Sequence, residues 1–142
     1  MMKLSKELIK KGIYLSGIMN IGGVLLFSRF FTNKVINEAD PVTMSNFGLL
    51  MIVVWGLVFL AIGTKWEHLK WVIGVFVIEK FIYGLTWSKW IMSNDLSSVY
   101  KEDTMAGIFY TIYGLNDWFF CIFYLLVFIY LSKLEKKQTD HH

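Results

Sequence analysis

Four long apolar blocks are the feature that most restricts what this chain can fold into, and they cover residues 12–31, 41–64, 69–90 and 107–131. Each block has about 20 residues or more. At a rise of about 1.5 Å per residue, a helix of that length crosses a hydrocarbon layer of about 30 Å. Residues 49–62 contain no charged side chain on any face. A helix in a water-soluble bundle would show a polar face repeating about every 3.6 residues.

The blocks predict an all-α integral membrane protein. Helices satisfy their own backbone polar groups in lipid, whereas barrel strands are about 10 residues long and alternate in polarity. A composition with 56% hydrophobic and 18% aromatic residues agrees with a lipid environment. We expect residues 1–142 to form a single transmembrane domain, a four-helix bundle in which neighbouring spans are antiparallel. The first block follows a lysine-rich segment, and we interpret it as a retained span rather than a removed signal.

The basic residues around the blocks predict the orientation of the spans. The side that holds both chain ends has nine: Lys3, Lys6, Lys10, Lys11, Lys65, Lys70, Lys133, Lys136 and Lys137. The other side has four: Arg29, Lys34, Lys89 and Lys101. An excess of Lys and Arg marks the cytoplasmic side, so we expect both termini in the cytoplasm. The net charge of +3 then reflects topology, and we expect no nucleic-acid partner.

The connecting segments predict local structure. Asp40 and Pro41 have the pattern of a helix start, with Asp as the cap and Pro at the first helical position. Residues 32–40 are expected to form a short loop, residues 65–68 a tight turn, and residues 91–106 a polar connection with a short outer helix. Four tryptophans lie near block ends, as in an interfacial aromatic belt: Trp66, Trp71, Trp87 and Trp90.

Three ionisable side chains fall inside the predicted spans: Glu79, Lys80 and Asp117. Glu79 lies ten residues from the cytoplasmic end of its block, and Asp117 lies ten residues from the outer end of its block. Ten residues rise about 15 Å, so these side chains share a depth near the middle of the bilayer. A charge there costs at least about 2.5 kcal/mol. We therefore expect the three side chains to face inward and to meet.

Other polar side chains share helix faces with these three at about 100° per residue, and together they predict a ligand- or proton-binding site. The principal residues of this site are Asn20, Glu79, Lys80, Tyr83, Tyr113 and Asp117. The secondary residues are Ser16, Trp87, Tyr110 and Asn116. Gly17 and Gly23 predict a close helix approach in the first span. The second span has no ionisable residue and is expected to be an apolar wall.

The charges of the three ionisable residues leave alternatives open. Two acids and one base leave one negative charge unpaired if all ionise. One arrangement pairs Lys80 with Asp117 and leaves Glu79 protonated, whereas the other pairs Lys80 with Glu79. A structural role is also open, because a Lys–Asp pair and an Asn hydrogen bond are sufficient to hold helices together. We prefer a functional site, because ionisable residues inside a membrane usually mark one.

The residue content argues against metal and redox chemistry. Cys121 is the single cysteine, so the chain cannot form an internal disulfide. His68 is placed at the membrane edge, and the other two histidines are at the end of the chain. We therefore expect no metal and no cofactor.

Residues 71–84 (WVIGVFVIEKFIYG) resemble the third span of the DoxX-like and BphX-like proteins. The resemblance covers chain length, the number of spans and an acidic residue in the third span. It implies a small four-helix protein of the bacterial inner membrane. Lys80 and the Asn116–Asp117 pair have no counterpart in it, so no functional residue carries over.

Three functions are open at this point. The preferred one is a protein that binds or moves a lipophilic or amphipathic molecule at a site between the first, third and fourth spans, with Glu79 exchanging a proton. The second is a membrane-embedded enzyme that uses Glu79 or Asp117 as an acid–base on a lipid-soluble substrate. The third is a non-catalytic subunit of a homo-oligomer or a larger membrane complex.

Overall fold

The structure, a computed structural model, describes residues 4–142, and every regular element in that range is a helix. The four long helices are α1 (Lys6–Phe27), α3 (Asn46–Ile62), α4 (Lys70–Ser93) and α6 (Thr104–Thr139). They are connected by α2 (Lys34–Ala39), the 3-10 helix η1 (Trp66–His68) and α5 (Leu96–Glu102). The predicted all-α class is thus confirmed, whereas Lys3 lies outside the described residues.

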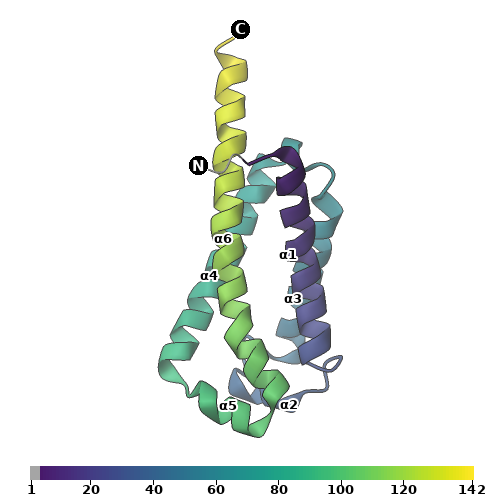
Figure 1. The fold of residues 1–142 in the computed structure, drawn as a ribbon, viewed down its shortest axis with the longest axis vertical. Coiled ribbons are helices and arrows are strands. Elements are labelled where there is room, and N and C mark those ends of the chain that lie inside the picture. Colours follow the sequence, from purple (N-terminus) through teal and green to yellow (C-terminus); the bar gives the residue numbers. More distant parts are fainter. Residues whose placement is uncertain (1–3) are drawn as a thin grey trace.

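The long helices run alternately in opposite directions, so that both chain ends and η1 lie at one end of the molecule (Figure 1). Helices α2 and α5 lie at the other end. The most extensive contacts are between α4 and α6 and between α1 and α3. A Cβ atom on Gly17 would lie 2.9 Å from the carbonyl oxygen of Gly56, so these glycines let α1 and α3 approach closely. The predicted role of Gly17 is confirmed.

Two apolar cores lie at different heights in the bundle. The core nearer η1 contains Phe59 and Phe76, whose rings meet edge to face at 4.7 Å. The core nearer α2 contains Trp90 and Tyr110, whose rings stack at 4.3 Å. Asp117 belongs to neither core, and along α6 it lies between residues of the two. Asp117 and the buried side chains bonded around it, Lys80 and Asn20, therefore form a polar layer between two apolar cores.

Helix α3 begins later than the sequence predicts. Asp40 does not cap the start of α3, because its Oδ1 accepts a hydrogen bond from the Thr43 amide at 3.1 Å and closes a turn that follows α2. Ser45 is the cap instead, and its Oγ accepts from the Gly48 amide at 3.1 Å. The helix start predicted at residue 41 is therefore wrong. Asn37 stabilises the turn, because its Nδ2 donates to the Met44 carbonyl at 2.8 Å.

The segment predicted to be a loop over residues 32–40 contains α2. Asn33 caps this helix, because its side-chain oxygen accepts a hydrogen bond from the Val35 amide at 3.2 Å. Within the helix, Ile36 is fully buried. Six residues are too few for an apolar period to show in the sequence. The short helix predicted within residues 91–106 is confirmed as α5.

Three of the four tryptophans predicted to form an interfacial belt are instead packed between helices. Trp66 and Trp90 are buried, and the Nε1 of Trp87 donates to the Tyr110 carbonyl at 2.6 Å. The ring of Trp87 lies where a Cβ atom on Gly114 would be. Gly114 has no side chain, and this leaves space for the ring. Only Trp71 fits the predicted position, with 74% of its surface exposed.

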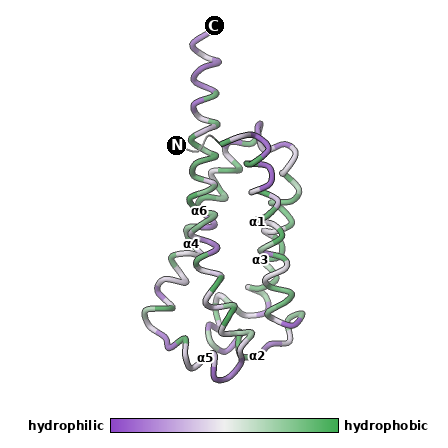
Figure 2. The backbone as a smooth tube through the Cα atoms, viewed as in Figure 1, coloured by the Kyte–Doolittle hydropathy of each residue, from purple (hydrophilic) through white to green (hydrophobic). Residues whose placement is uncertain are grey.

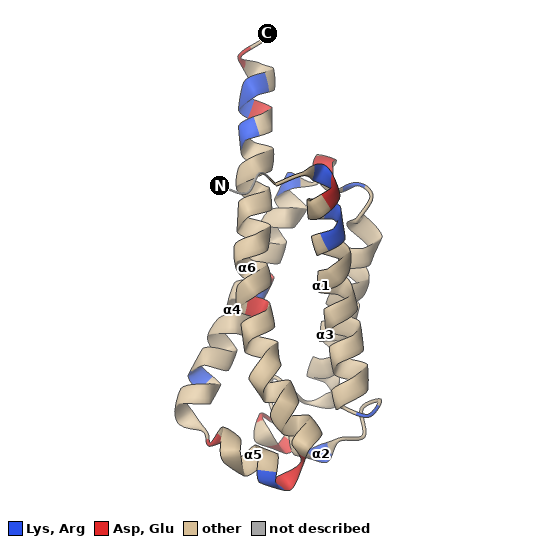
Figure 3. Ribbon diagram, in the orientation of Figure 1, with Lys and Arg blue, Asp and Glu red and all other residues tan. Residues whose placement is uncertain are grey.

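Hydrophobic stretches run along the long helices (Figure 2), and each of the four helices exposes large apolar side chains. Examples are Leu15, Ile18 and Leu26 on α1; Leu50, Val54 and Leu57 on α3; Ile78, Phe81 and Ile82 on α4; and Leu115, Phe119 and Ile122 on α6. Charged residues gather toward the two ends of the molecule, apart from one group at mid-height on α4 and α6 (Figure 3). By length and composition, α4 and α6 can each cross a membrane, and α3 is apolar with 17 residues.

Candidate functional site

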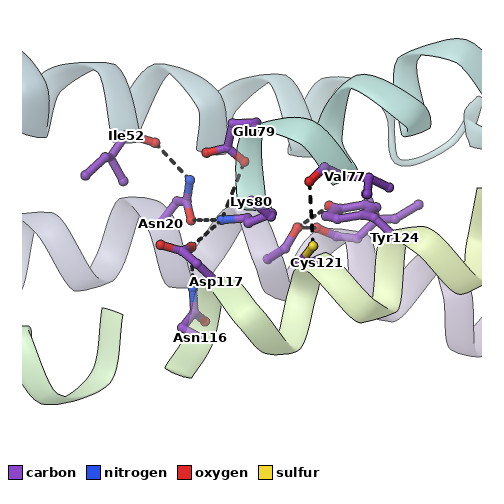
Figure 4. A network of polar contacts seen from close by, with 11 residues as sticks. Asn20, Ile52, Val77, Glu79, Lys80, Asn116, Asp117, Cys121 and Tyr124 are labelled. Carbon is purple, nitrogen blue, oxygen red and sulfur yellow. Dashed lines mark hydrogen bonds and ion pairs between the residues drawn. The ribbon is translucent and has the colours of Figure 1, made fainter. Parts of the chain in front are cut away.

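Lys80 of α4 is the centre of the buried polar cluster, and its side chain is 1% exposed. Its Nζ donates to Oδ1 of Asn20 at 2.9 Å and to Oδ1 of Asp117 at 2.9 Å (Figure 4). The ammonium also lies 5.0 Å from the centre of the Phe59 ring. A buried ammonium without partners is very costly, and two charged or polar oxygens and an aromatic face offset that cost here. Lys80 thereby links α1, α4 and α6 and faces α3.

Asn20 extends the cluster to α3, the one long helix that Lys80 does not hydrogen-bond. Its Nδ2 donates to the carbonyl oxygen of Ile52 in α3 at 3.1 Å, while its Oδ1 accepts from Lys80. The α3 segment predicted to be only an apolar wall therefore also supplies a backbone acceptor. Sequence reasoning missed this contact because every residue has a carbonyl group, and only the position of the helix determines which one is used.

Glu79 is next to Lys80 in sequence but makes no close pair with it. Its Oε2 lies 3.9 Å from the Lys80 Nζ and has no hydrogen-bond partner within residues 4–142. Of the two pairings left open by the sequence, the one between Lys80 and Asp117 is closer, at 2.9 Å against 3.9 Å for Glu79. The protonated state of Glu79 stays a prediction, and the missing partner is compatible with it.

An apolar pocket of about 380 Å³ lies beside the cluster, between α1, α3 and α6. Four polar residues line it, namely Asn20, Tyr113, Asn116 and Asp117. Its other walls are apolar and include Ile18 and Ile112, which are 58% and 37% exposed, so the pocket opens at the outer face of the bundle. Asp117 and Asn20 thus belong both to the buried polar cluster and to the wall of the open apolar pocket.

Gly22 and Gly23 form part of the α1 wall of this pocket. A Cβ atom added to either glycine would have no neighbouring atom within 4 Å. The prediction that Gly23 permits a close helix approach is therefore wrong, because no neighbouring helix lies against this position. The two missing side chains widen the pocket instead.

The remaining predicted site residues fall into three groups. Tyr113 and Asn116 line the pocket; the Tyr113 hydroxyl is buried without a hydrogen-bond partner in the described chain, and Asn116 Nδ2 contacts Asp117 Oδ1 at 3.4 Å. Tyr83 is half-buried and packs against the core nearer α2. The others lie outside the cluster: Ser16 is hydrogen-bonded to Tyr124, Tyr110 donates to the Ile36 carbonyl at 2.6 Å, and Trp87 donates to Tyr110.

A second polar network, which sequence reasoning missed, joins the ends of α1 and α6. The guanidinium of Arg29 donates to both carboxylate oxygens of Asp103, at 2.9 and 3.2 Å. The Nδ2 of Asn33 also donates to Asp103 and to the Phe27 carbonyl. Burial alone would raise the pKa of Asp103, but the hydrogen bonds from Arg29 and Asn33 outweigh it and hold that pKa below its ordinary value. A capping pattern at Asp103 is visible in the sequence, whereas its distant partners are not.

The same network holds a strained turn. Arg29, Phe30 and Phe31 have φ values of 49°, 55° and 68°, a left-handed conformation that costs about 1–2 kcal/mol per residue. Ser28 stabilises the turn, because its Oγ accepts from the Phe31 amide at 2.9 Å. The ion pair between Arg29 and Asp103 therefore fixes, at the end of the bundle near α2, a turn that local backbone preferences disfavour.

Comparisons of the chain with known protein families, curated proteins and solved structures found no match. Within residues 4–142, no group of three or more His, Cys, Asp and Glu side chains is arranged to hold a metal ion. The geometry of the polar cluster and its pocket is therefore the basis for a functional proposal.

Proposed function

We propose that the chain is a four-span integral membrane protein with both termini in the cytoplasm. The support is the apolar outward face of all four long helices, because a water-soluble monomer rarely exposes an apolar patch larger than about 300–600 Å². Helix α3 is the shortest of them, and its 17 residues rise about 26 Å, close to the thickness of the hydrocarbon layer. The uneven distribution of basic residues supports the orientation. A bacterial inner membrane and the DoxX-like resemblance belong to the same proposal.

We further infer that the protein binds or moves a lipophilic or amphipathic small molecule in the pocket between α1, α3 and α6. One observation carries this proposal: the buried charged layer reaches an open apolar pocket through Asp117 and Asn20. A volume of about 380 Å³ lies within the range of small-molecule sites. The apolar body of the ligand would lie along Gly22 and Gly23, and its polar end would meet Asp117.

Filling the pocket tests this proposal. The substitution Gly23→Leu places a side chain in open space, so we expect it to lower the affinity for farnesol at least tenfold without loss of folded protein. Binding is measured by native mass spectrometry and by the ligand-induced rise in unfolding temperature. Val75→Leu, on the exposed face of α4 and away from the pocket, is the matched control and should bind like the unaltered protein. Equal affinity in the Gly23→Leu variant would refute binding in this pocket.

Proton linkage is a separate part of the proposal, and it is assigned to Glu79. Its Oε2 lies beside Lys80 without a hydrogen bond, so a proton can be gained or lost there without breaking the Lys80–Asp117 pair. We expect farnesol affinity to vary with pH in the unaltered protein and to become independent of pH in Glu79→Gln. A pH profile that is the same in both proteins would exclude Glu79 as the exchanging group.

A further inference from the structure

We propose that the ligand of this pocket carries a hydrogen-bond donor, a hydroxyl or an ammonium group, at its polar end, and that it is not an anion. This inference rests on the proposed binding function and adds the chemical class of the ligand. It follows from which polar atoms of the cluster are already engaged and which face the pocket.

The Lys80 ammonium is the one buried cation of the cluster, and it is not accessible to a ligand in the pocket. Lys80 Nζ is directed to the oxygens of Asn20 and Asp117 at 2.9 Å each, with Glu79 Oε2 at 3.9 Å. Its side chain is 1% exposed, and it does not line the pocket. No other Lys or Arg of the described chain lines the pocket either. An anionic head group would therefore find no charged partner.

Of the four polar residues that line the pocket, Asp117 and Asn116 have an oxygen without a donor, and the Tyr113 hydroxyl, which can donate or accept, is buried without a partner in the described chain. Asp117 Oδ1 is taken by Lys80, whereas its Oδ2 accepts no hydrogen bond from residues 4–142. The amide oxygen of Asn116 also accepts none, and both amide atoms of Asn20 are engaged. Two oxygens without donors thus lie at the polar end of an apolar pocket, and a ligand donor would satisfy them.

The carboxyl groups of the cluster exclude an anionic ligand. The cluster contains two carboxyl groups, Glu79 and Asp117, and the single ammonium of Lys80. A carboxylate or phosphate placed beside Asp117 would add a like charge in a medium of low dielectric constant, where repulsion is strong. An ester or ketone would supply only acceptors and would leave the oxygens of Asp117 and Asn116 without donors.

The shape of the pocket fits access from the lipid side. Ile18 and Leu26 of α1 and Ile112 of α6 are exposed at its rim, at 58%, 60% and 37%. Gly22 and Gly23 leave the rim open between these side chains. A molecule with an apolar body can therefore enter sideways between α1 and α6 and reach Asp117 with its polar end.

The test uses four probes that share one apolar body: farnesol, farnesylamine, farnesoic acid and farnesyl acetate. Each is titrated onto the purified full chain in nanodiscs, and affinity is read by native mass spectrometry and by the rise in unfolding temperature. We expect the alcohol, the amine or both to bind at least tenfold more tightly than the acid and the acetate. The two favoured probes also distinguish a neutral ligand from a cationic one.

Two variants examine the acceptor atoms. Asp117→Asn should bring the affinities for the alcohol and the acetate within about threefold of each other. Because that variant also removes the partner of Lys80, Asn116→Leu serves as a second one that leaves the Lys80–Asp117 pair intact. It should reduce the preference for donor-bearing probes several-fold, with an unfolding temperature close to that of the unaltered protein.

The outcomes separate the two proposals. If the acid or the acetate binds as tightly as the alcohol and Gly23→Leu abolishes that binding, the donor rule is wrong and the binding function stands. If no probe binds the unaltered protein, both proposals fail. If Gly23→Leu changes the oligomeric state in size-exclusion chromatography with light scattering, a second copy of the chain occupies the pocket and the ligand proposal is overturned.

Discussion

Lys80 is a single side chain on which the middle of the bundle depends, because its ammonium is shared between α1 and α6. Its contribution to stability is not the sum of its hydrogen bonds, since burying the charges of Lys80 and Asp117 has its own large cost. Removal of one partner differs from removal of both. Loss of the ammonium alone leaves a buried carboxylate without compensation, whereas loss of both charges leaves an apolar layer.

We therefore expect Lys80→Met to lower the free energy of unfolding by about 3–5 kcal/mol, and the double variant Lys80→Met, Asp117→Leu to recover most of that loss. Unfolding is followed by helical circular dichroism in mixed micelles during titration with SDS. Lys89→Met, an exposed position on the same helix, is the control and should change little. A double variant as unstable as the single one would show that the uncompensated charge is not the cause.

Asp103 shows how a residue outside the apolar region controls stability through protonation. Its folded-state pKa is lowered, so the Arg29–Asp103 network is fully formed above the ordinary pKa of 3.8 and is lost as the pH falls through the folded-state value. We expect stability to fall below about pH 4 and expect Asp103→Asn to lack part of that fall. Because Arg29 is half exposed, Asp103→Asn should cost only about 1 kcal/mol at neutral pH. Unfolding midpoints between pH 3 and 7 provide the measurement, and parallel curves for both proteins would count against this assignment.

At the scale of the elements, α1 uses its glycines for opposite purposes along its length. Gly17 lies against the α3 backbone, whereas Gly22, just over one turn later, faces open space. Gly17 thus lies on the face of α1 that contacts α3, whereas Gly22 lies on a different face, which lines the pocket beside Asn20. Beyond Gly22, α1 still packs against α3, because Val24 shares a core with Leu49.

The same substitution at these two glycines should have opposite effects. Gly17→Ala places a Cβ atom 2.9 Å from the Gly56 carbonyl oxygen, and we expect a loss of about 1–3 kcal/mol because a backbone atom must move. Gly22→Ala meets no atom and should be neutral or stabilising by up to about 1 kcal/mol, the usual gain in helix propensity. Unfolding midpoints of the two variants in one detergent provide the comparison. Equal destabilisation would mean that the face of α1 at Gly22 is packed as closely as the face at Gly17.

At the scale of the whole molecule, apolar side chains occupy both the two cores and the outward faces, and charged residues are concentrated at the ends (Figure 3). This distribution agrees with a surrounding apolar medium, in which packing and internal polar contacts hold helices together. It places η1 and both chain ends on one side of the proposed membrane and α2 and α5 on the other (Figure 1).

Single cysteines test that orientation. In a Cys121→Ala background, we expect a membrane-impermeant thiol reagent added outside bacterial spheroplasts to label Ser97→Cys in α5 and to leave Lys136→Cys in α6 unlabelled. Both positions are exposed in the structure, so burial cannot explain a difference. Permeabilised cells, in which both cysteines should react, provide the control. Labelling of both positions in intact spheroplasts would contradict the proposed topology.

Much of the polar layer was accessible from the sequence, because depth and helix face are local properties. Equal distances from opposite block ends place Glu79 and Asp117 at one level, and Lys80 does contact both Asn20 and Asp117 in the structure. Helix starts were less accessible. Asp40 and Ser45 are both good caps, and the buried turn at Met44 decides between them.

The sequence by itself determined the helical class, the approximate extent of the long helices and the group of charges near their centres. Only the tertiary structure decided that Oε2 of Glu79 has no hydrogen-bond partner in the described chain, that the Ile52 carbonyl completes the cluster and that a pocket opens beside Gly23. The physical reason is that apolar period and charge depth follow from one helix at a time. Hydrogen-bond pairing and free volume depend on the distances between helices, which the packing of side chains from all four sets together.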